Sequence, residues 1–169
     1  MSLWDKKDVP HKGWICVEMI DLGEDAEGMD FETRKAELYE MCEMCNQEGI
    51  RYVHVMEHPE YEGQLRVGCI CAENMENDYI APREREKNLR NRQKRKMNFL
   101  KNDWQYRANG NMVLKYKGRY ITIMKSKYNP SCYGIAYGGN FIWEYRGKKI
   151  RDIRTAKLAA FEVFDALEV

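Results

Sequence analysis

Four of the six cysteines lie within one stretch of thirty residues, and their spacing constrains the fold more than any other feature of the sequence. Cys42 and Cys45 form a Cys-x2-Cys pair, and Cys69 and Cys71 form a Cys-x-Cys pair. A Cys-x2-Cys turn brings two thiolates to one ion, and zinc favours four such ligands in a tetrahedron. The spacing therefore predicts one zinc ion held by these four cysteines. The alternatives are reduced cysteines buried in a small core, or a redox role for the first pair.

A helix is predicted directly before the first cysteine pair. Residues 13–23 predict a strand, and residues 30–42 place apolar side chains near helical spacing, with Asp30 as a cap and Thr33 as a second cap. The helix is expected to deliver the cysteine pair at its end. A redox Cys-x2-Cys pair usually stands at the start of a helix, where the dipole lowers a thiol pKa, so this order disfavours the redox alternative.

The second cysteine pair ends a predicted β-hairpin. Residues 50–57 and 64–71 are β-rich and flank a turn that contains Pro and Gly. Residues two apart on a strand point to the same face, so both cysteines of this pair should face one ion at the base of the hairpin. His58 lies toward the tip, roughly 20 Å from Cys71 at ~3.3 Å per residue, which makes it a poor ligand. His54 lies nearer the base and is a candidate substitute for one cysteine.

Four cysteines would close the metal site. A catalytic zinc keeps an open position and usually carries His or carboxylate ligands. The sequence has no H-E-x-x-H, P-loop, nucleophile elbow or dinucleotide fingerprint. Glu57, His58 and Glu60 could form a metal-dependent nuclease cluster, but we interpret them as turn and surface residues. We therefore expect a structural zinc and no enzyme, with a metal-dependent hydrolase or nuclease as an alternative.

The stretch from C-x2-C through "IRYVHVMEHP" to "LRVGCICA" resembles the treble-clef or ribbon-like zinc modules of many uncharacterised bacterial and phage proteins. Those modules have a C-x2-C turn, an "(I/L)-x-Y-V" strand and a "V-G-x-x-C" strand end, whose cysteine falls here on Cys71, with Cys69 at the variable position before it. The resemblance covers about 35 residues and continues through "RE-x3-LRNR-x2-R" and "NFL" to the "GN-x2-LK" strand. It implies a fold and a zinc site but no activity, and it leaves the fourth ligand open between Cys69, His54 and His58.

Charge divides the chain into two halves. Residues 1–82 carry seven Lys/Arg and 19 Asp/Glu, whereas residues 83–169 carry 21 Lys/Arg and eight Asp/Glu, and the net charge of the whole is +1. Such asymmetry indicates nucleic-acid contact by the basic part, or attraction between the two halves. No apolar run approaches the ~20 residues of a membrane span, and the N-terminus lacks the apolar core of a signal peptide. We therefore expect a cytoplasmic protein with no membrane partner.

The segment after Pro82 predicts a long, mostly exposed basic helix. Residues 83–104 contain no helix breaker, and nine Lys/Arg against two Glu lie between residues 83 and 101. Cations on one helix suit a phosphate backbone, because each neutralised phosphate releases a counterion. The alternative is a solvated helix whose cations bridge to the acidic N-terminal half.

A β-β-β-α module is predicted at the C-terminal end. Residues 111–127 predict two strands joined at Lys117-Gly118, residues 131–149 predict two more joined at Gly138-Gly139-Asn140, and residues 154–169 predict an amphipathic helix capped by Thr155. Aromatic residues are interleaved with the cations, and strand alternation should divide them between the two faces: Tyr116, Tyr120, Tyr128, Tyr133, Tyr137, Phe141, Trp143 and Tyr145. The module resembles, in outline, the sheet DNA-binding modules of the integrase-arm and AP2 type, and its "AK-x-AA" is similar to the last helix of double-stranded-RNA-binding domains.

The sequence thus predicts an α+β protein: a zinc-ribbon-like hairpin module over residues 1–82, a basic helix or connector over 83–105, and an antiparallel sheet packed against a C-terminal helix over 106–169. The expected function is a zinc-containing nucleic-acid-binding or accessory protein, with DNA or RNA as partner. The alternative is a protein–protein adaptor or a self-associating protein. The candidate nucleic-acid contacts are Arg83, Arg85, Arg90, Arg92, Lys94, Arg95, Lys96, Lys115, Lys117, Arg119, Lys148, Lys149, Arg151 and Arg154.

Overall fold

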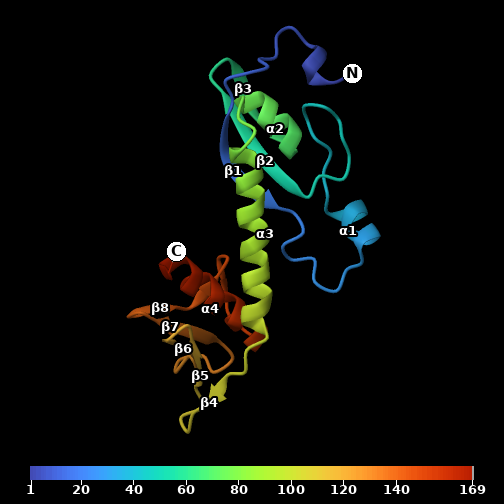
Figure 1. The fold of residues 1–169 in the computed structure, drawn as a ribbon. Coiled ribbons are helices and arrows are strands. Elements are labelled where there is room, and N and C mark those ends of the chain that lie inside the picture. Colours follow the sequence, from blue (N-terminus) through green and yellow to red (C-terminus); the bar gives the residue numbers. More distant parts are fainter. Residues whose placement is uncertain (169) are drawn as a thin grey trace. The chain divides into compact units, whose positions relative to one another are not determined.

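The computed structural model describes residues 1–168 (Figure 1). The chain forms two compact units, Met1–Gln93 and Lys94–Val169, and the division falls within the helix α3 (Ala81–Leu100). Each unit has a hydrophobic core of its own, so each is described separately. The long basic helix predicted after Pro82 is present as α3; its residues up to Gln93 belong to the first unit and those from Lys94 to the second.

The first unit contains one three-stranded antiparallel sheet with the order β1-β2-β3. The hairpin predicted from the alternating pattern is confirmed, because His54 of β2 lies opposite Val67 of β3 and Met56 lies opposite Leu65. Helix α2 packs against β1 and β2 (Figure 1). The elements of this unit before α3 are η1 (Leu3–Asp5), β1 (Ile15–Asp21), α1 (Phe31–Glu37), β2 (Tyr52–His58), β3 (Tyr61–Val67) and α2 (Cys69–Glu76).

Apolar side chains from the loops and α2 form the core beneath this sheet. Met44, Met56 and Met75 are fully buried in it, and the flexible thioether of methionine suits an irregular space of this kind. Cys42 and Cys71 belong to the same core. The first unit therefore places two of the predicted metal ligands where solvent has little access.

Helix α1 is shorter than the predicted helix over residues 30–42. Asp30 caps its first turn as predicted, but the helix ends at Glu37. Glu40 instead forms an antiparallel bridge with Ile50, in which the two residues exchange backbone hydrogen bonds of 3.1 and 2.8 Å. This bridge holds the chain in an extended form before Cys42, so the cysteine pair lies in a separate turn and not at the end of the helix.

The strand predicted over residues 64–71 also ends early, at Val67. Gly68 stands at the N-cap position of α2, and the helix begins at Cys69. A side chain at Gly68 would crowd Ile50, since a Cβ atom built there would lie 2.9 Å from the Ile50 Cδ1 atom. The prediction that Cys69 and Cys71 share one face of a strand is therefore wrong, because residues two apart on an α-helix point in nearly opposite directions.

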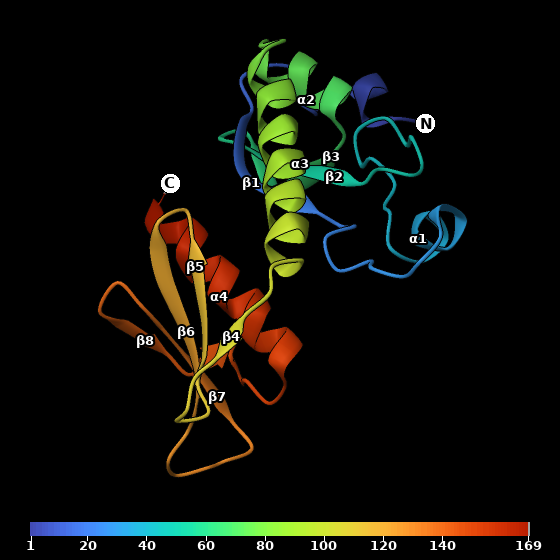
Figure 2. The same ribbon diagram turned by 60° about the horizontal axis from the view of Figure 1, so that its bottom comes forward.

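The second unit contains a five-stranded antiparallel sheet in the order β4-β5-β6-β7-β8, with α4 along one face (Figure 2). The predicted turns are confirmed: Lys117 and Gly118 have φ angles of 48° and 78°, and Gly138 and Gly139 have φ angles of 57° and 80°. A short hairpin, β9-β10, was not predicted. The elements are β4 (Gln105–Tyr106), β5 (Met112–Tyr116), β6 (Arg119–Lys125), β7 (Tyr133–Tyr137), β8 (Asn140–Ile142), β9 (Glu144–Tyr145), β10 (Lys148–Lys149) and α4 (Ile153–Glu168).

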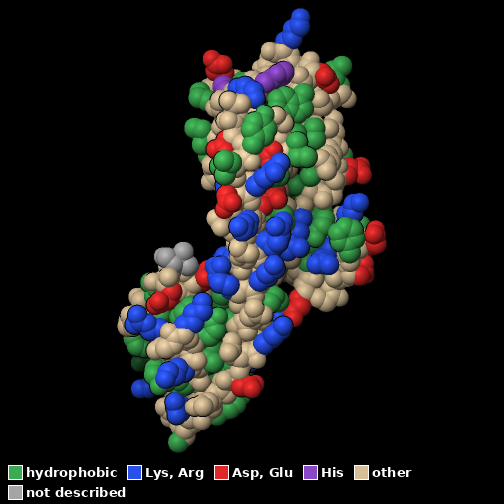
Figure 3. All heavy atoms as spheres, in the orientation of Figure 1, with side chains coloured by type: hydrophobic (Ala, Val, Ile, Leu, Met, Phe, Trp, Pro, Cys, Tyr) green, Lys and Arg blue, Asp and Glu red, His purple; other side chains and the backbone are tan. Residues whose placement is uncertain are grey.

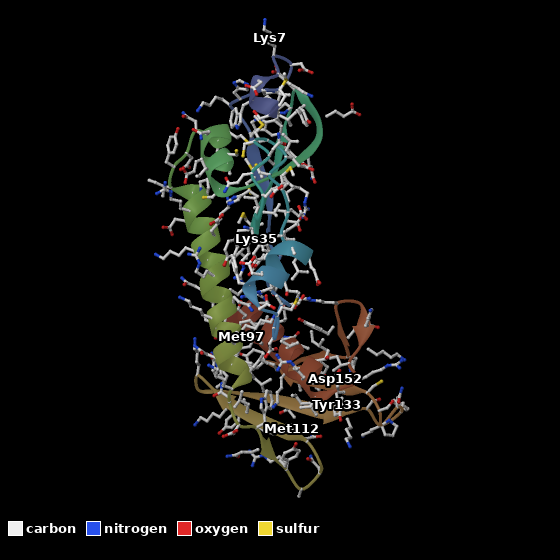
Figure 4. All side chains as sticks on the ribbon, turned by 90° about the vertical axis from the view of Figure 1, so that its right-hand side faces the viewer. Lys7, Lys35, Met97, Met112, Tyr133 and Asp152 are labelled. Atoms are coloured by element: carbon white, nitrogen blue, oxygen red, sulfur yellow. The ribbon has the colours of Figure 1, made fainter. Side chains whose placement is uncertain are left out.

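The core of the second unit lies between the sheet and α4. Phe99 and Phe161 are fully buried with ring centroids 5.5 Å apart. Asp152, labelled just before the start of α4 in Figure 4, accepts hydrogen bonds from the Thr155 backbone N–H at 2.7 Å and the Thr155 hydroxyl at 2.8 Å. Asp152 is therefore the capping residue, and the prediction that Thr155 caps the helix is wrong.

These observations confirm the predicted fold class. The protein is mixed α+β, its sheets are antiparallel, and the C-terminal helix packs on the second sheet. Among the helices of residues 1–168, none combines the length and the apolar content needed to cross a bilayer.

Candidate metal centre and basic sheet face

Three cysteines meet in the first unit. Cys42 and Cys45 come from the turn after α1, and Cys71 comes from the first turn of α2. The three sulfur atoms all lie within 4.8 Å of one another. The turn is closed by hydrogen bonds from the Asn46 N–H to the Cys42 carbonyl and from the Cys42 N–H to the Gln47 carbonyl, both of 2.8 Å. Cys42, Cys45 and Cys71 thus lie close enough together to bind one metal ion.

The surroundings of these sulfur atoms fit a cation. Ligands at ~2.3 Å from a tetrahedral zinc lie about 3.8 Å apart, and the three sulfur atoms all lie within 4.8 Å of one another. A hydrogen bond from the Cys71 thiol, together with backbone amides of Gly68, Cys45 and Met44, lowers the pKa of Cys42 to about 5. The same pairing with Cys42, and burial, raise the pKa of Cys71. The cluster therefore stabilises one thiolate even before an ion is bound.

Cys69 belongs to a different group of side chains. Its sulfur lies within 4.8 Å of ligand atoms of His54 and Glu86. The fully buried His54 ring has its Nε2 atom 3.1 Å from a Glu86 oxygen and its Nδ1 atom 3.3 Å from an Arg85 nitrogen. Because a guanidinium can only donate, Nδ1 accepts and Nε2 carries the proton given to Glu86. Burial and the nearby Glu86 and Glu73 carboxylates raise the pKa of Cys69 to about 12.

The predicted set of four cysteines is therefore not brought together around one point. Cys71 reaches Cys42 and Cys45, whereas Cys69 turns to the group formed with His54 and Glu86. The start of a helix at Cys69 is the physical reason, because it separates the directions of the two side chains. A hollow of about 210 Å³ borders both groups and is lined by Cys42, Cys45, Gln47, Gly49, Ile50, Arg51, Tyr52, Gly68, Cys69, Ile70, Cys71 and Glu86.

His58 stands at the tip of the hairpin, and it joins neither group within residues 1–168. Its Nε2 atom lies 2.9 Å from the Lys12 carbonyl, and its Nδ1 atom accepts a hydrogen bond of 3.0 Å from the Glu60 N–H. The Glu57 carboxylate accepts a hydrogen bond from the Gln64 side chain. The side chains of Glu57 and His58 thus already have hydrogen-bond partners within the first unit.

The arginines of α3 are largely paired with acidic residues of their own unit. The sequence predicts either a helix whose cations contact nucleic acid or a solvated helix whose cations form ion pairs with acidic residues. Most arginines in the part of α3 that belongs to the first unit form such ion pairs. Arg83 pairs with Glu73 at 2.6 Å, Arg85 pairs with Glu76, and Arg92 pairs with Glu24 at 3.2 Å. Arg90 instead lies over the Tyr52 ring, 5.5 Å from its centroid.

Cations in the second half of α3 also form contacts within their own unit. Arg95 pairs with Asp165 of α4 at 3.0 Å. Lys96 is only 1% exposed, so it cannot meet a phosphate without a rearrangement. Lys94 remains exposed. The candidate contacts Arg85, Arg92 and Lys96 are therefore poorly placed for an external ligand. The exposed half of the Lys/Arg residues of α3 consists of Arg83, Lys87, Arg90 and Lys94.

The face of the second sheet that points away from α4 is open. Residues that alternate with the core positions form a continuous row across its strands, in which Val113 pairs with Thr122, Thr122 with Ala136, and Ala136 with Phe141. Strand alternation divides the aromatic residues as predicted. Tyr116, Tyr133, Tyr137 and Tyr145 pack in or against the core, whereas Tyr120, Tyr128, Phe141 and Trp143 are exposed.

The chain that builds this sheet is strongly basic. Between Asp103 and Glu144 it contains six Lys/Arg and no Asp/Glu, and blue side chains predominate over this unit in Figure 3. The exposed candidates of the unit are Lys94, Lys115, Lys117, Arg119, Lys148, Lys149, Arg151 and Arg154. Of these, Lys115 lies on the open face, with its Nζ atom 5.8 Å from the centroid of the exposed Tyr120 ring. Arg119 has the strand parity of the core positions and lies 4.0 Å from Glu168 of α4.

Two features of these sites had no clear signal in the sequence. Glu86 reaches His54 only through the packing of α3 near β2, a contact between residues 32 positions apart. The group of rings formed by Tyr128, Phe141 and Trp143 depends on the path of the loop between β6 and β7. Comparison with known proteins identifies no relative: no family model matches the chain, and no curated protein or solved structure is significantly similar to it.

Proposed function

We propose that this protein binds nucleic acid through the open face of its five-stranded sheet, and that a structural zinc ion held by Cys42, Cys45 and Cys71 stabilises the other unit. The observation that carries the first part is the composition of that face: cations and exposed rings on a segment without a single carboxylate between Asp103 and Glu144. We assign the metal a structural role and no catalytic one.

Charge and rings together favour nucleic acid over a protein partner. Lys115 and Lys117 are exposed at the hairpin of β5 and β6, and Lys127 is exposed in the loop after β6. Each phosphate that they neutralise would release a counterion. Bases stack on exposed aromatic side chains whatever their sequence, because every base has a π-face. An adaptor that used the acidic half would bind through the carboxylates of the first unit, of which Glu24 and Glu73 are already paired with arginines of α3.

The choice of zinc as the metal is supported by the cysteine ligands and by their order in the chain. Thiolates are soft ligands that select zinc, copper(I) or iron–sulfur clusters. A turn that supplies two ligands, followed by a hairpin and the first turn of a helix that supplies a third, is the order found here. Three cysteines account for three of the four positions of a tetrahedron and so do not close the site. The structural role is supported by the burial of Cys42 and Cys71 in the core of the first unit.

Nucleic-acid binding is tested by the salt dependence of affinity. Fluorescence anisotropy with a labelled 20-nucleotide probe should give binding at ~50 mM salt that weakens steeply toward ~200 mM. Replacing three cations by Gln should reduce the slope of log K against log salt by about 2 to 3. The variant is Lys115→Gln, Lys117→Gln and Lys127→Gln, and the matched control is Lys6→Gln, Lys7→Gln and Lys35→Gln, three exposed cations of the first unit.

No binding at ~50 mM salt, where the electrostatic contribution is strongest, would remove the proposal. Equal losses in the two triple variants would show that binding follows the total charge and not the sheet face.

The zinc proposal is tested by metal content after purification. We expect about one zinc per chain, lost in Cys71→Ser and retained in Cys69→Ser, because only Cys71 shares a group with Cys42 and Cys45. Cys16→Ser is a control, since Cys16 lies outside both groups. Equal loss in Cys69→Ser and Cys71→Ser would contradict the three-cysteine set and restore the four-cysteine one.

A further inference from the structure

One end of the open sheet face is hollowed. The hollow has a volume of about 480 Å³, which lies within the ~300–1,000 Å³ of ligand pockets. It is formed where β6 ends, where the loop from β6 to β7 begins, and along β8 and the residue that follows it. Its lining combines three aromatic rings with two lysines: Met124, Lys125, Ser126, Lys127, Tyr128, Phe141 and Trp143.

The rings around this hollow are not part of the core. Trp143 is 43% exposed, Phe141 is 63% exposed and Tyr128 is 99% exposed. Trp143 lies against the backbone of Gly134, where a Cβ atom would come within 2.5 Å of two ring carbons. Glycine therefore allows the indole to lie close to β7. Apolar rings gathered in a surface hollow are typical of a binding site.

The loop that carries Tyr128 is ordered by its own hydrogen bonds. The Ser126 hydroxyl oxygen accepts from the Tyr128 N–H at 3.3 Å and the Asn129 N–H at 3.2 Å. The Ser126 N–H donates to the Cys132 carbonyl at 2.9 Å. These bonds hold the base of the loop, so that little backbone conformational entropy is lost when a ligand contacts the ring.

The chemistry of the hollow points to a flat, uncharged ring attached to an anion. Lys125 and Lys127 are exposed beside it, and no carboxylate lines it among the described residues. A nucleobase offers a face for stacking, and its phosphate offers the charge that the lysines attract. In a duplex both faces of each base are covered by its neighbours, so only an unpaired base can enter between the rings.

We propose that the hollow beside Trp143 receives an unpaired nucleobase, so that the ligand of this sheet face is single-stranded nucleic acid. The inference rests on the proposed function and deepens it. Tyr128 and Trp143 stack on the base, while Lys125 and Lys127 contact the adjoining phosphates. The sequence of the strand matters little, because stacking accepts every base.

The test compares a labelled 20-nucleotide oligothymidine with a duplex of the same length, using the full chain and anisotropy at equal salt. Tyr128→Ala and Trp143→Leu should each weaken single-strand binding by about 5- to 150-fold, the range for loss of one stacked base. Duplex binding and the salt slope should not change, since neither variant removes a charge. Tyr106→Ala is the matched control, because Tyr106 is 74% exposed in the same unit but does not line the hollow.

The outcomes separate this inference from the proposed function. If single strands and duplexes both bind with steep salt dependence but Tyr128→Ala has no effect, the sheet binds nucleic acid and the base site is wrong. If neither probe binds, the proposed function fails and the base site with it. Tyr128 is fully exposed, so its replacement tests the site without a risk to folding.

Discussion

Removal of the proposed zinc should destabilise the first unit and leave the second one folded. The two hydrophobic cores share no residue: one contains Cys42 and Cys71, and the other lies between the five-stranded sheet and α4. An ion that binds only the folded form stabilises it by mass action, and the effect falls on the unit that contains its ligands. Chelation is therefore expected to lower one thermal transition and not the other.

The size of the shift follows from the length of the unit. Met1–Gln93 comprises 93 residues, so at about 2.1 cal/mol/K per residue its unfolding entropy is about 0.2 kcal/mol/K. A free zinc concentration of ~100 times the dissociation constant gives about 2.7 kcal/mol of stabilisation. Dividing the two predicts a fall of about 14 °C on chelation. Each further tenfold excess of zinc adds ~1.4 kcal/mol, or about 7 °C.

Differential scanning calorimetry of the full chain, with zinc and then with excess chelator, measures this shift. Cys71→Ser should reproduce the chelated trace whether or not zinc is added, whereas Cys132→Ser, at a buried cysteine of the second unit, should keep the zinc response. A chelator that moves both transitions together, or that leaves both in place, would refute the assignment of the metal to the first unit. The same holds if Cys71→Ser retains the full zinc response.

Three further predictions concern the second unit. Phe161→Ala, at a ring only 1% exposed, should lower the free energy of unfolding, measured with denaturant, by about 3–5 kcal/mol. A smaller loss would mean that neighbouring side chains move in to fill the cavity. Asp152→Ala removes both hydrogen bonds to Thr155 and should cost about 1 kcal/mol, whereas Asp152→Asn, which can still accept, should recover part of it. Burial and the hydrogen bond to Glu168 raise the pKa of Tyr137, so stability should fall as the pH rises above ~10; Tyr137→Phe should lose this part of the pH dependence in denaturant titrations at pH 9 and pH 11.

The hairpin of the first unit could be predicted because its pattern is local. Residues 52–58 and 61–67 are β-rich and follow one another across a short turn, so they pair as neighbours in sequence. The helix at Cys69 could not be read in the same way, since the alternating "VGCIC" is also typical of a strand. The helix begins directly after Gly68, where a built Cβ atom would lie 2.9 Å from the Ile50 Cδ1 atom, a contact between distant residues that the local pattern does not reveal. A local signal exists in Ala72 and Met75, which are three apart on the buried side of α2, but it lies after the cysteines.

The cap of α4 and the ion pairs of α3 also could not be predicted from the sequence alone. Asp152 and Thr155 are both good N-cap residues, and the choice between them depends on where the chain leaves β10. The run of cations in α3 indicates a basic helix, but sequence does not reveal which cations find a carboxylate. Glu24 lies 68 positions before Arg92, and Asp165 lies 70 positions after Arg95. Long-range packing therefore decides which part of the basic half stays available.

The net charge of +1 is a poor guide to whether this chain can bind a polyanion. By units, residues 1–93 carry a net charge of −9 and residues 94–169 a net charge of +10. At physiological salt the Debye length is ~8 Å, so a phosphate on the open sheet face responds mainly to the charges near it. Cations that face a carboxylate, such as Arg119 at 4.0 Å from Glu168, contribute little there. By contrast, Lys115, Lys117 and Lys127 lie in a stretch without acidic residues. Binding should therefore follow the charge of the sheet face, and replacing Lys115, Lys117 and Lys127 should matter more than an equal change of charge in residues 1–93.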